Sequence, residues 1–262
     1  MPILLPSGLR RLEDEEFGRV AYRAMEVVFQ VHNEFGRLFD ERIYHAEIAR
    51  RLDGARIQVP IEVVFESFHK LYYLDLLYAE GAVFELKAVD ALTDRHRAQL
   101  LNYLHLLDLP HGKLVNLRNE LVEHEFVNAP WRREDRRRFD VDDTGWEKAA
   151  GGTFDLKELL VTILRDWGVG LEIPLYEQVM THFLGGEVNA LRPVEVLVGQ
   201  TKVGEQACKL ITPDSAFKIT SLASAVGHYE EHLRRLLAHT ALKRIQWINI
   251  GRKVVAFRTI EK

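Results

Sequence analysis

The sequence predicts an α/β protein that contains two copies of one structural unit. Three observations support this prediction: helical and strand-like apolar patterns alternate along the first half, the second half repeats that pattern, and a charged segment separates the halves. We expect domains over residues 1–130 and 153–262, joined by a linker over residues 131–152 that is rich in charge and ends in two glycines.

The elements of the first half follow from its apolar spacing and its turn residues. Helical spacing predicts two helices at the start, the first closed by Gly36 in a left-handed conformation. Three β-rich segments joined by short turns predict a meander, and a helix with Thr93 as its N-cap separates it from two more strands. The expected order is ααβββαββ, with helices at 16–35, 40–52 and 94–107 and strands at 57–67, 71–78, 82–89, 113–117 and 121–127.

Composition limits the class of protein. A chain of 262 residues that is 47% apolar can bury a sizeable core, and no apolar run is long enough to span a membrane. The single cysteine, Cys208, rules out a disulfide framework and a thiolate metal cluster, so we expect a cytoplasmic protein. The net charge of −4 gives no overall attraction to nucleic acid, so contact with a polyanion needs a local basic surface or metal ions.

Opposite charges interrupt two strands that are otherwise apolar. Glu85 and Lys87 lie two apart in AVFELKAV and therefore share one face of the strand. If this strand pairs with LYYLDLLY around a turn centred on Glu80, Asp75 and Glu85 are equidistant from the turn and face each other. Two carboxylates in one buried place need a cation between them, and oxygen ligands suit magnesium or manganese. The alternative is a cross-strand salt bridge on a solvated face.

Further residues in the two flanking helices complete a known pattern. Gln99 and Tyr103 lie one turn apart on the later helix, and the earlier helix contains Glu41 and Tyr44. Together with Asp75 and the E-L-K-A string, these residues resemble the PD-(D/E)XK nuclease superfamily, and within it the proteins named for a G-x-x-E-x-x-Y motif. The resemblance covers residues 17–128 and includes V-P-I at 59–61, Q-L-L-N-Y at 99–103 and K-L-V-N-L at 113–117. One departure is Leu38, which stands where the motif has its glycine.

This resemblance implies a restriction-endonuclease-like unit, in which helices flank a mixed β-sheet, and a nuclease that depends on magnesium or manganese. It implies that Asp75 and Glu85 bind the metal and that Glu41 completes or supports its shell. Lys87 would position or activate the attacking water and offset charge on the phosphoryl group. Gln99 would orient the site, and Tyr103 would contact the substrate or pack beneath it.

The second half repeats the first but lacks these residues. When Pro60 is aligned with Pro193, the strands align without gaps, and in nearly the same register Asn116 falls on Asn249 and Tyr44 on Tyr176. We infer a duplication that forms a pseudo-dimer within one chain. No carboxylate remains at the positions of Glu41, Asp75, Glu85, Lys87 and Gln99, where the second copy has Ile173, Cys208, Lys218, Thr220 and His232.

Two functions from different classes are consistent with the sequence. The first is a metal-dependent nuclease that acts on DNA or RNA, with one active site in the N-terminal unit; the C-terminal unit then serves as a built-in dimer partner or a substrate-binding surface. The second is a catalytically silent nucleic-acid-binding or scaffold protein, in which Asp75, Glu85 and Lys87 form a buried ion network. The complete set of site residues favours the first, and the acidic N-terminal half and the missing motif glycine favour the second.

Overall fold

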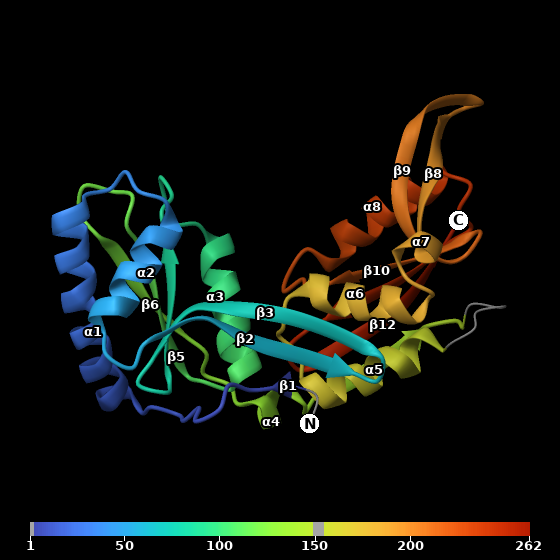
Figure 1. Ribbon diagram of the computed structural model, residues 1–262. Helices are drawn as coiled ribbons and strands as arrows, with labels where there is room; N and C mark the ends of the chain where they lie inside the picture. Colours follow the sequence, from blue (N-terminus) through green and yellow to red (C-terminus); the bar gives the residue numbers. More distant parts are fainter. Residues whose placement is uncertain (1–2, 149–154) are drawn as a thin grey trace. The chain divides into compact units, whose positions relative to one another are not determined.

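The computed structural model describes residues 3–148 and 155–262, which fall into two units, Met1–Asp135 and Arg136–Lys262 (Figure 1). Each unit contains a six-stranded mixed sheet with helices packed against it. The described part of the chain contains no helix that is long and apolar enough to cross a membrane.

The sheet of the first unit follows the order of its strands in the chain, β1-β2-β3-β4-β5-β6. All neighbours pair antiparallel except β4 and β5, which are parallel. A parallel pair needs a crossover connection, and the helix α3 (Asp94–Leu107) supplies it. The strands are β1 (Ile3–Leu4), β2 (Arg56–Phe65), β3 (Phe68–Tyr78), β4 (Ala82–Lys87), β5 (His111–Asn116) and β6 (Glu123–Asn128).

Helices cover both faces of this sheet. The apolar stripes of α1 (Asp14–Phe35) and α2 (Glu41–Arg51) pack on Leu76, Phe84, Leu86 and Val115. Figure 1 shows α3 on the other side of the strands from these two helices. Because it is covered on both faces, β4 is buried at all six positions, and its charged residues have little access to water.

The chain leaves α1 through a conformation that only glycine adopts readily. Gly36 has φ 68° and ψ −154°, and its N–H donates to His32 O at 2.8 Å. This is not the left-handed cap expected from the sequence, since ψ lies far from the left-handed helical value. Gly168, which follows α5 in the second unit, has a similar conformation with φ 87° and ψ 161°.

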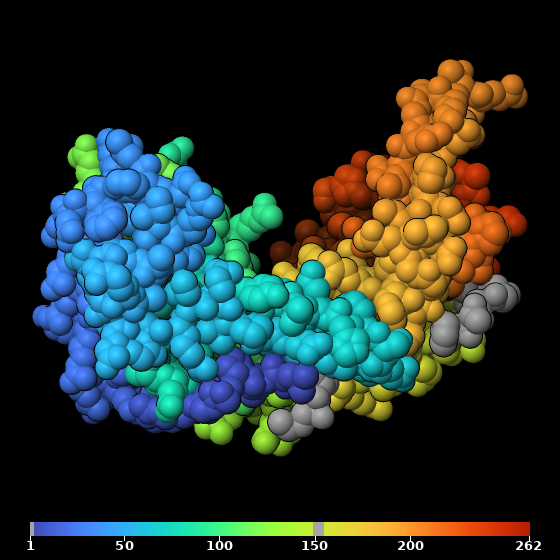
Figure 2. Space-filling view, in the orientation of Figure 1, coloured from blue at the N-terminus to red at the C-terminus, as the bar shows by residue number. Residues whose placement is uncertain are grey.

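The sheet of the second unit has the order β7-β12-β11-β10-β9-β8. Its parallel pairs are β10 with β11 and β12 with β7. The β8–β9 hairpin is largely exposed and extends from the rest of the unit (Figure 2). The elements are α4 (Arg133–Arg136, at the unit boundary), β7 (Asp140–Gly145), α5 (Leu156–Trp167), α6 (Ile173–Phe183), α7 (Glu187–Ala190), β8 (Leu191–Val198), β9 (Thr201–Thr212), β10 (Ser215–Thr220), α8 (Val226–Ala238), β11 (Arg244–Ile250) and β12 (Val254–Glu261).

The segment 131–152 differs from the expected linker, because much of it has regular structure. Residues 140–145 form the edge strand β7, held on β12 by a parallel ladder and by the ion pair of Arg258 with Asp142. Trp146 packs edge-on against Phe257, with ring centroids 5.3 Å apart. An edge strand pairs on one side only, so charged side chains fit there without an apolar pattern. Residues 149–152 of the expected linker, and the first two residues of the expected second domain, lie outside the described residues.

Candidate active site

Three carboxylates and one ammonium group meet at the C-terminal end of β4. Asp75 comes from β3, Glu85 and Lys87 from β4, and Glu41 from the first turn of α2. The β3–β4 ladder pairs Leu76 with Phe84, so paired residues are equidistant from Glu80, which is the register expected for a turn centred on that residue. The next positions outward in this register are Asp75 and Glu85.

Lys87 lies among the three carboxylates. Its Nζ is 2.5 Å from Glu85 Oε1, 3.3 Å from Asp75 Oδ2 and 3.9 Å from Glu41 Oε1. Backbone N–H groups hold two of the acids in place: Leu86 N donates to Asp75 Oδ2 at 3.1 Å, and Ala88 N donates to Glu41 Oε2 at 3.2 Å. The site is therefore built on a rigid strand end and not on a loop.

Glu85 is the most deeply buried of these charges. Its side chain is fully buried, and burial together with the Asp75 charge raises its pKa to about 8, although Lys87 opposes the shift. While Oε1 contacts Lys87, Oε2 has no hydrogen-bond donor among the described residues. The Glu85 carboxyl group also interacts with the Asp75 carboxyl group. A buried carboxylate oxygen without a donor is costly, so this place favours either a proton shared with Asp75 or a bound cation.

Lys87 remains charged despite its burial. Burial alone would lower its pKa, but the charges of Glu85, Asp75 and Glu41 raise the pKa above its ordinary value. One ammonium group cannot balance three carboxylates, so the cluster carries excess negative charge whenever all three are ionised. This excess of negative charge favours either a bound divalent cation or a bound proton. The raised pKa of Glu85 shows that the metal-free cluster binds a proton.

Gln99 and Tyr103 contact each other on α3. Gln99 Nε2 donates to the Tyr103 hydroxyl at 3.2 Å. The Tyr103 ring packs edge-on against the ring of Tyr72, with ring centroids 6.1 Å apart. Burial raises the pKa of Tyr103, and the charges of Glu85 and Asp75 raise it further. Tyr103 thus lies near the carboxylates as part of the wall of the site.

His45 also lies in this cluster, and the sequence reasoning missed it. Glu41, His45 and Asp75 each offer a ligand atom within 4.8 Å of the others. His45 Nε2 lies 3.3 Å from Leu86 O, a contact that requires Nε2 to carry the proton, and 3.8 Å from Glu41 Oε1. The available signal was the i, i+4 spacing of Glu41 and His45, which places both on one face of α2.

Tyr44 has a structural role. Its ring is fully buried, its hydroxyl donates to Gly36 O at 2.7 Å, and it accepts a hydrogen bond from Phe39 N at 3.3 Å. These bonds fix the turn between α1 and α2 and so determine where the first turn of α2, with Glu41, meets β4. Leu38 lies in this turn with its side chain exposed, so the missing motif glycine leaves Glu41 in position.

The corresponding positions of the second unit form no such cluster among the described residues. Cys208 is buried on β9, Lys218 lies on β10, and Thr220 donates a hydrogen bond to Asn249 Oδ1 at 2.9 Å. Ile173 and His232 lie on α6 and α8. Within the part of the chain that the structure describes, the group of acidic, histidine or cysteine side chains close enough to hold a metal ion lies in the first unit.

A family model and a solved structure each match part of this chain. No curated protein matches it. The crystal structure of SSO0001 matches at 21% identity over 45% of this chain and 63% of that chain, with a TM-score of 0.30. A family model matches residues 18–129, a segment that includes all of the predicted site residues. That model describes the PD-(D/E)XK nuclease superfamily, so the sequence match to this superfamily lies within the first unit.

Proposed function

We propose that the first unit is a metal-dependent nuclease that hydrolyses phosphodiester bonds of DNA or RNA, as a PD-(D/E)XK protein of the G-x-x-E-x-x-Y type. The observation that carries this proposal is the buried cluster of Glu41, Asp75 and Glu85 around Lys87, with Glu85 Oε2 lacking a donor among the described residues. The described residues of the second unit have no equivalent cluster, and the proposal therefore assigns the chain a single active site.

The chain's own residues suit this chemistry. Asp75 and Glu85 would bind a magnesium or manganese ion, with Glu41 completing or supporting the shell, because hard divalent cations prefer carboxylate oxygens. Such an ion acts as a Lewis acid on the phosphate and lowers the pKa of a bound water. Lys87 holds its proton and offsets the charge that develops on the phosphoryl group, and it also positions the attacking water.

His45 supports the site from α2. Its ring donates to Leu86 O, and Leu86 N in turn donates to Asp75, so the two interactions hold the backbone between Glu85 and Lys87. Gln99 and Tyr103 form the wall on the α3 side and limit how substrate approaches the carboxylates.

We further propose that the second unit is a degenerate copy of the first. In the alignment that pairs Pro60 with Pro193, the β4–β5 register of Lys87 with Asn116 becomes the β10–β11 register of Thr220 with Asn249. Asn116 bonds both the N–H and the C=O of Val89, and Asn249 makes the same two bonds with Leu222.

The helix turns support the same proposal. In the alignment that pairs Tyr44 with Tyr176, the bonds of Tyr44 to Gly36 and Phe39 become those of Tyr176 to Gly168 and Leu171. A shared core pattern with repeated side-chain bonds is what a duplication produces, while loss of the carboxylates removes only the chemistry.

Manganese titration and cleavage assays test the nuclease proposal. Calorimetry should show that the wild-type protein binds one manganese ion per chain, and the protein should cut single- or double-stranded DNA or RNA. The Asp75→Ala and Glu85→Ala variants should lose both manganese binding and cleavage. Glu26→Ala, which removes an exposed carboxylate on α1, is the matched control. Absence of manganese binding in the wild type would instead make the cluster a structural ion network and favour a catalytically silent binding or scaffold protein.

A further inference from the structure

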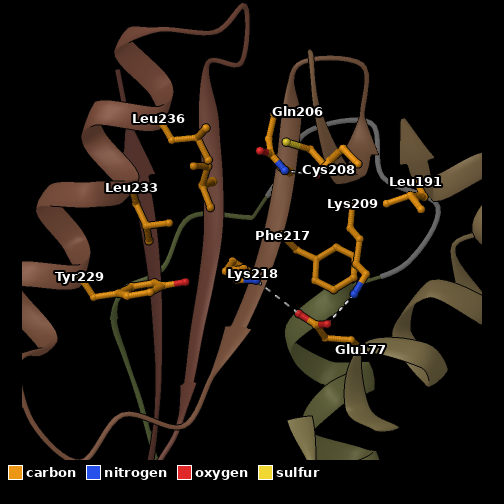
Figure 3. A pocket seen from close by; sticks show the side chains of 13 residues that line it. Glu177, Leu191, Gln206, Cys208, Lys209, Phe217, Lys218, Tyr229, Leu233 and Leu236 are labelled. Atoms are coloured by element: carbon orange, nitrogen blue, oxygen red, sulfur yellow. Dashed lines mark hydrogen bonds and ion pairs between the residues drawn. The ribbon is translucent and has the colours of Figure 1, made fainter. Parts of the chain in front are cut away.

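The second unit contains a pocket of about 310 Å³ between α8 and the sheet (Figure 3). This volume is at the lower end of the range of small-ligand sites. Polar groups from α6, β9 and β10 line one side, and the side chains of α8 line the other. The lining residues include Glu177, Cys208, Lys209, Lys218, Tyr229, Leu233 and Leu236.

The pocket lies where the first unit has its charged cluster. Its walls come from α6, β9, β10 and α8, the elements that correspond in chain order to α2, β3, β4 and α3. Cys208 aligns with Asp75, Lys218 with Glu85, and Glu177 with His45. The cluster in one unit and the pocket in the other are therefore two versions of the same place in the fold.

The charge of this place is inverted between the units. The first unit has three carboxylates and one lysine there, whereas the pocket is lined by two lysines and Glu177. Lys209 Nζ lies 2.5 Å from Glu177 Oε2 and neutralises it. Lys218 Nζ lies 3.9 Å from Glu177 Oε1, its one ion pair among the described residues, and its side chain is 48% exposed. The pocket thus has one positive charge in excess and suits a singly charged anion.

The opposite wall is apolar and partly aromatic. Leu233 and Leu236 project from α8 into the pocket, and the Tyr229 hydroxyl points the same way (Figure 3). Tyr229 is held in place by Trp247, with ring centroids 5.4 Å apart and planes tilted by 33°. A rigid aromatic ring next to aliphatic side chains is a surface on which a flat, weakly polar group can pack.

We infer that this pocket binds one nucleotide of a single-stranded nucleic acid. Lys218 contacts the phosphodiester, which carries one negative charge, and the base packs on Tyr229, Leu233 and Leu236. This inference rests on the proposed action on nucleic acid, because a phosphodiester joined to a flat base matches both the charge and the apolar wall. Because a base that is stacked and paired in a duplex must be flipped out before it can enter a pocket, the site selects unpaired strands.

Binding is tested with a fluorescently labelled single-stranded oligonucleotide and the full chain in EDTA, so that no metal contributes. Lys218→Gln should weaken binding and reduce the slope of log affinity against log salt by about 0.7, the value for one phosphate contact on a single strand. Lys253→Gln removes the same charge from an exposed position of the same unit and should leave the slope unchanged. Tyr229→Ala should weaken binding roughly 5- to 150-fold through lost stacking.

A second readout avoids the risk that Tyr229→Ala destabilises the unit. Cys208 lines the pocket and is the single cysteine of the sequence, so its modification by a small thiol reagent is read directly by mass spectrometry. The single-stranded oligonucleotide should slow this modification, and the duplex of the same sequence should not. Equal salt slopes for the two lysine variants, or no protection of Cys208, would overturn the inference. The nuclease proposal is tested separately, by the manganese binding and nucleic-acid cleavage of the Asp75→Ala and Glu85→Ala variants.

Discussion

Replacing Glu85 by glutamine should stabilise the metal-free protein at alkaline pH. The native state holds Glu85 with a pKa of about 8, against an ordinary value of 4.5. Between these values the native state keeps a proton that the unfolded state has released, so this group lowers the free energy of unfolding as pH rises. Below about pH 4.5 the contribution disappears, because the carboxyl is protonated in both states.

The size of the effect follows from that pKa shift. At about 1.36 kcal/mol per pKa unit, the full shift corresponds to about 5 kcal/mol above pH 8, and at pH 7 to about 3 kcal/mol. Glutamine keeps the shape of Glu85 and carries no charge at any pH. The Glu85→Gln variant should therefore be more stable than the wild type at pH 8.5 by a few kcal/mol, and equally stable near pH 4.5.

Urea-induced unfolding in EDTA, followed by circular dichroism between pH 4.5 and 8.5, measures this difference in the free energy of unfolding. Glu26→Gln is the control, since that carboxylate is exposed on the surface of α1. Manganese should narrow the stability difference between the two proteins. An ion that binds only the native wild type adds about 2.7 kcal/mol to its free energy of unfolding when the ion is present at 100 times its Kd. A wild type and a Glu85→Gln variant with parallel pH profiles in EDTA would refute the assignment of the buried charge to Glu85.

Three further predictions concern the same cluster and its support. Manganese binding at pH 7 should release about one proton as Glu85 ionises, and affinity should rise with pH up to about 8; calorimetry in buffers of different ionisation enthalpy would show no such release if Glu85 were already ionised. Lys87→Met should keep manganese binding but lower single-turnover cleavage by about 10²–10³-fold, the scale of one lost preorganised hydrogen-bond donor; an unchanged rate would remove Lys87 from the chemistry. Tyr44→Phe should cost about 1–3 kcal/mol of stability through its two hydrogen bonds and weaken manganese binding, because those bonds position Glu41. Tyr176→Phe should cost a similar amount of stability and leave manganese affinity unchanged; equal manganese affinities of the two variants would contradict the positioning role of Tyr44.

Periodicity located the helices and strands of the first unit because each buries a regular apolar face. The expected helix at 94–107 agrees with α3, and the expected strands agree with β2 to β6 within a few residues at each end. The two-residue strand β1 escaped notice because so short a segment has no period, although Ile3 is fully buried against β2. The strand β7 escaped for a different reason, since its charged side chains occupy an edge of the sheet.

Part of the candidate site could also be predicted from local pattern, and part could not. Strand alternation and a turn centred on Glu80 were enough to predict that Asp75, Glu85 and Lys87 meet, because side-chain direction in a hairpin is determined locally. The positions of Glu41 and His45 depend on how α2 packs against the end of β4, a contact between segments that lie far apart in the chain.

The sequence by itself determined the longer helices and strands of the first unit, the hairpin register and the two strands that carry the charges, because these depend on spacing between near neighbours. Only the tertiary structure decided that Glu85 is fully buried, that its Oε2 lacks a donor among the described residues and that its pKa is raised. Only the structure, likewise, brought Lys218 and Glu177 opposite Tyr229 around one pocket. The physical reason is that burial and electrostatic environment are set by packing between distant segments, which no local pattern records.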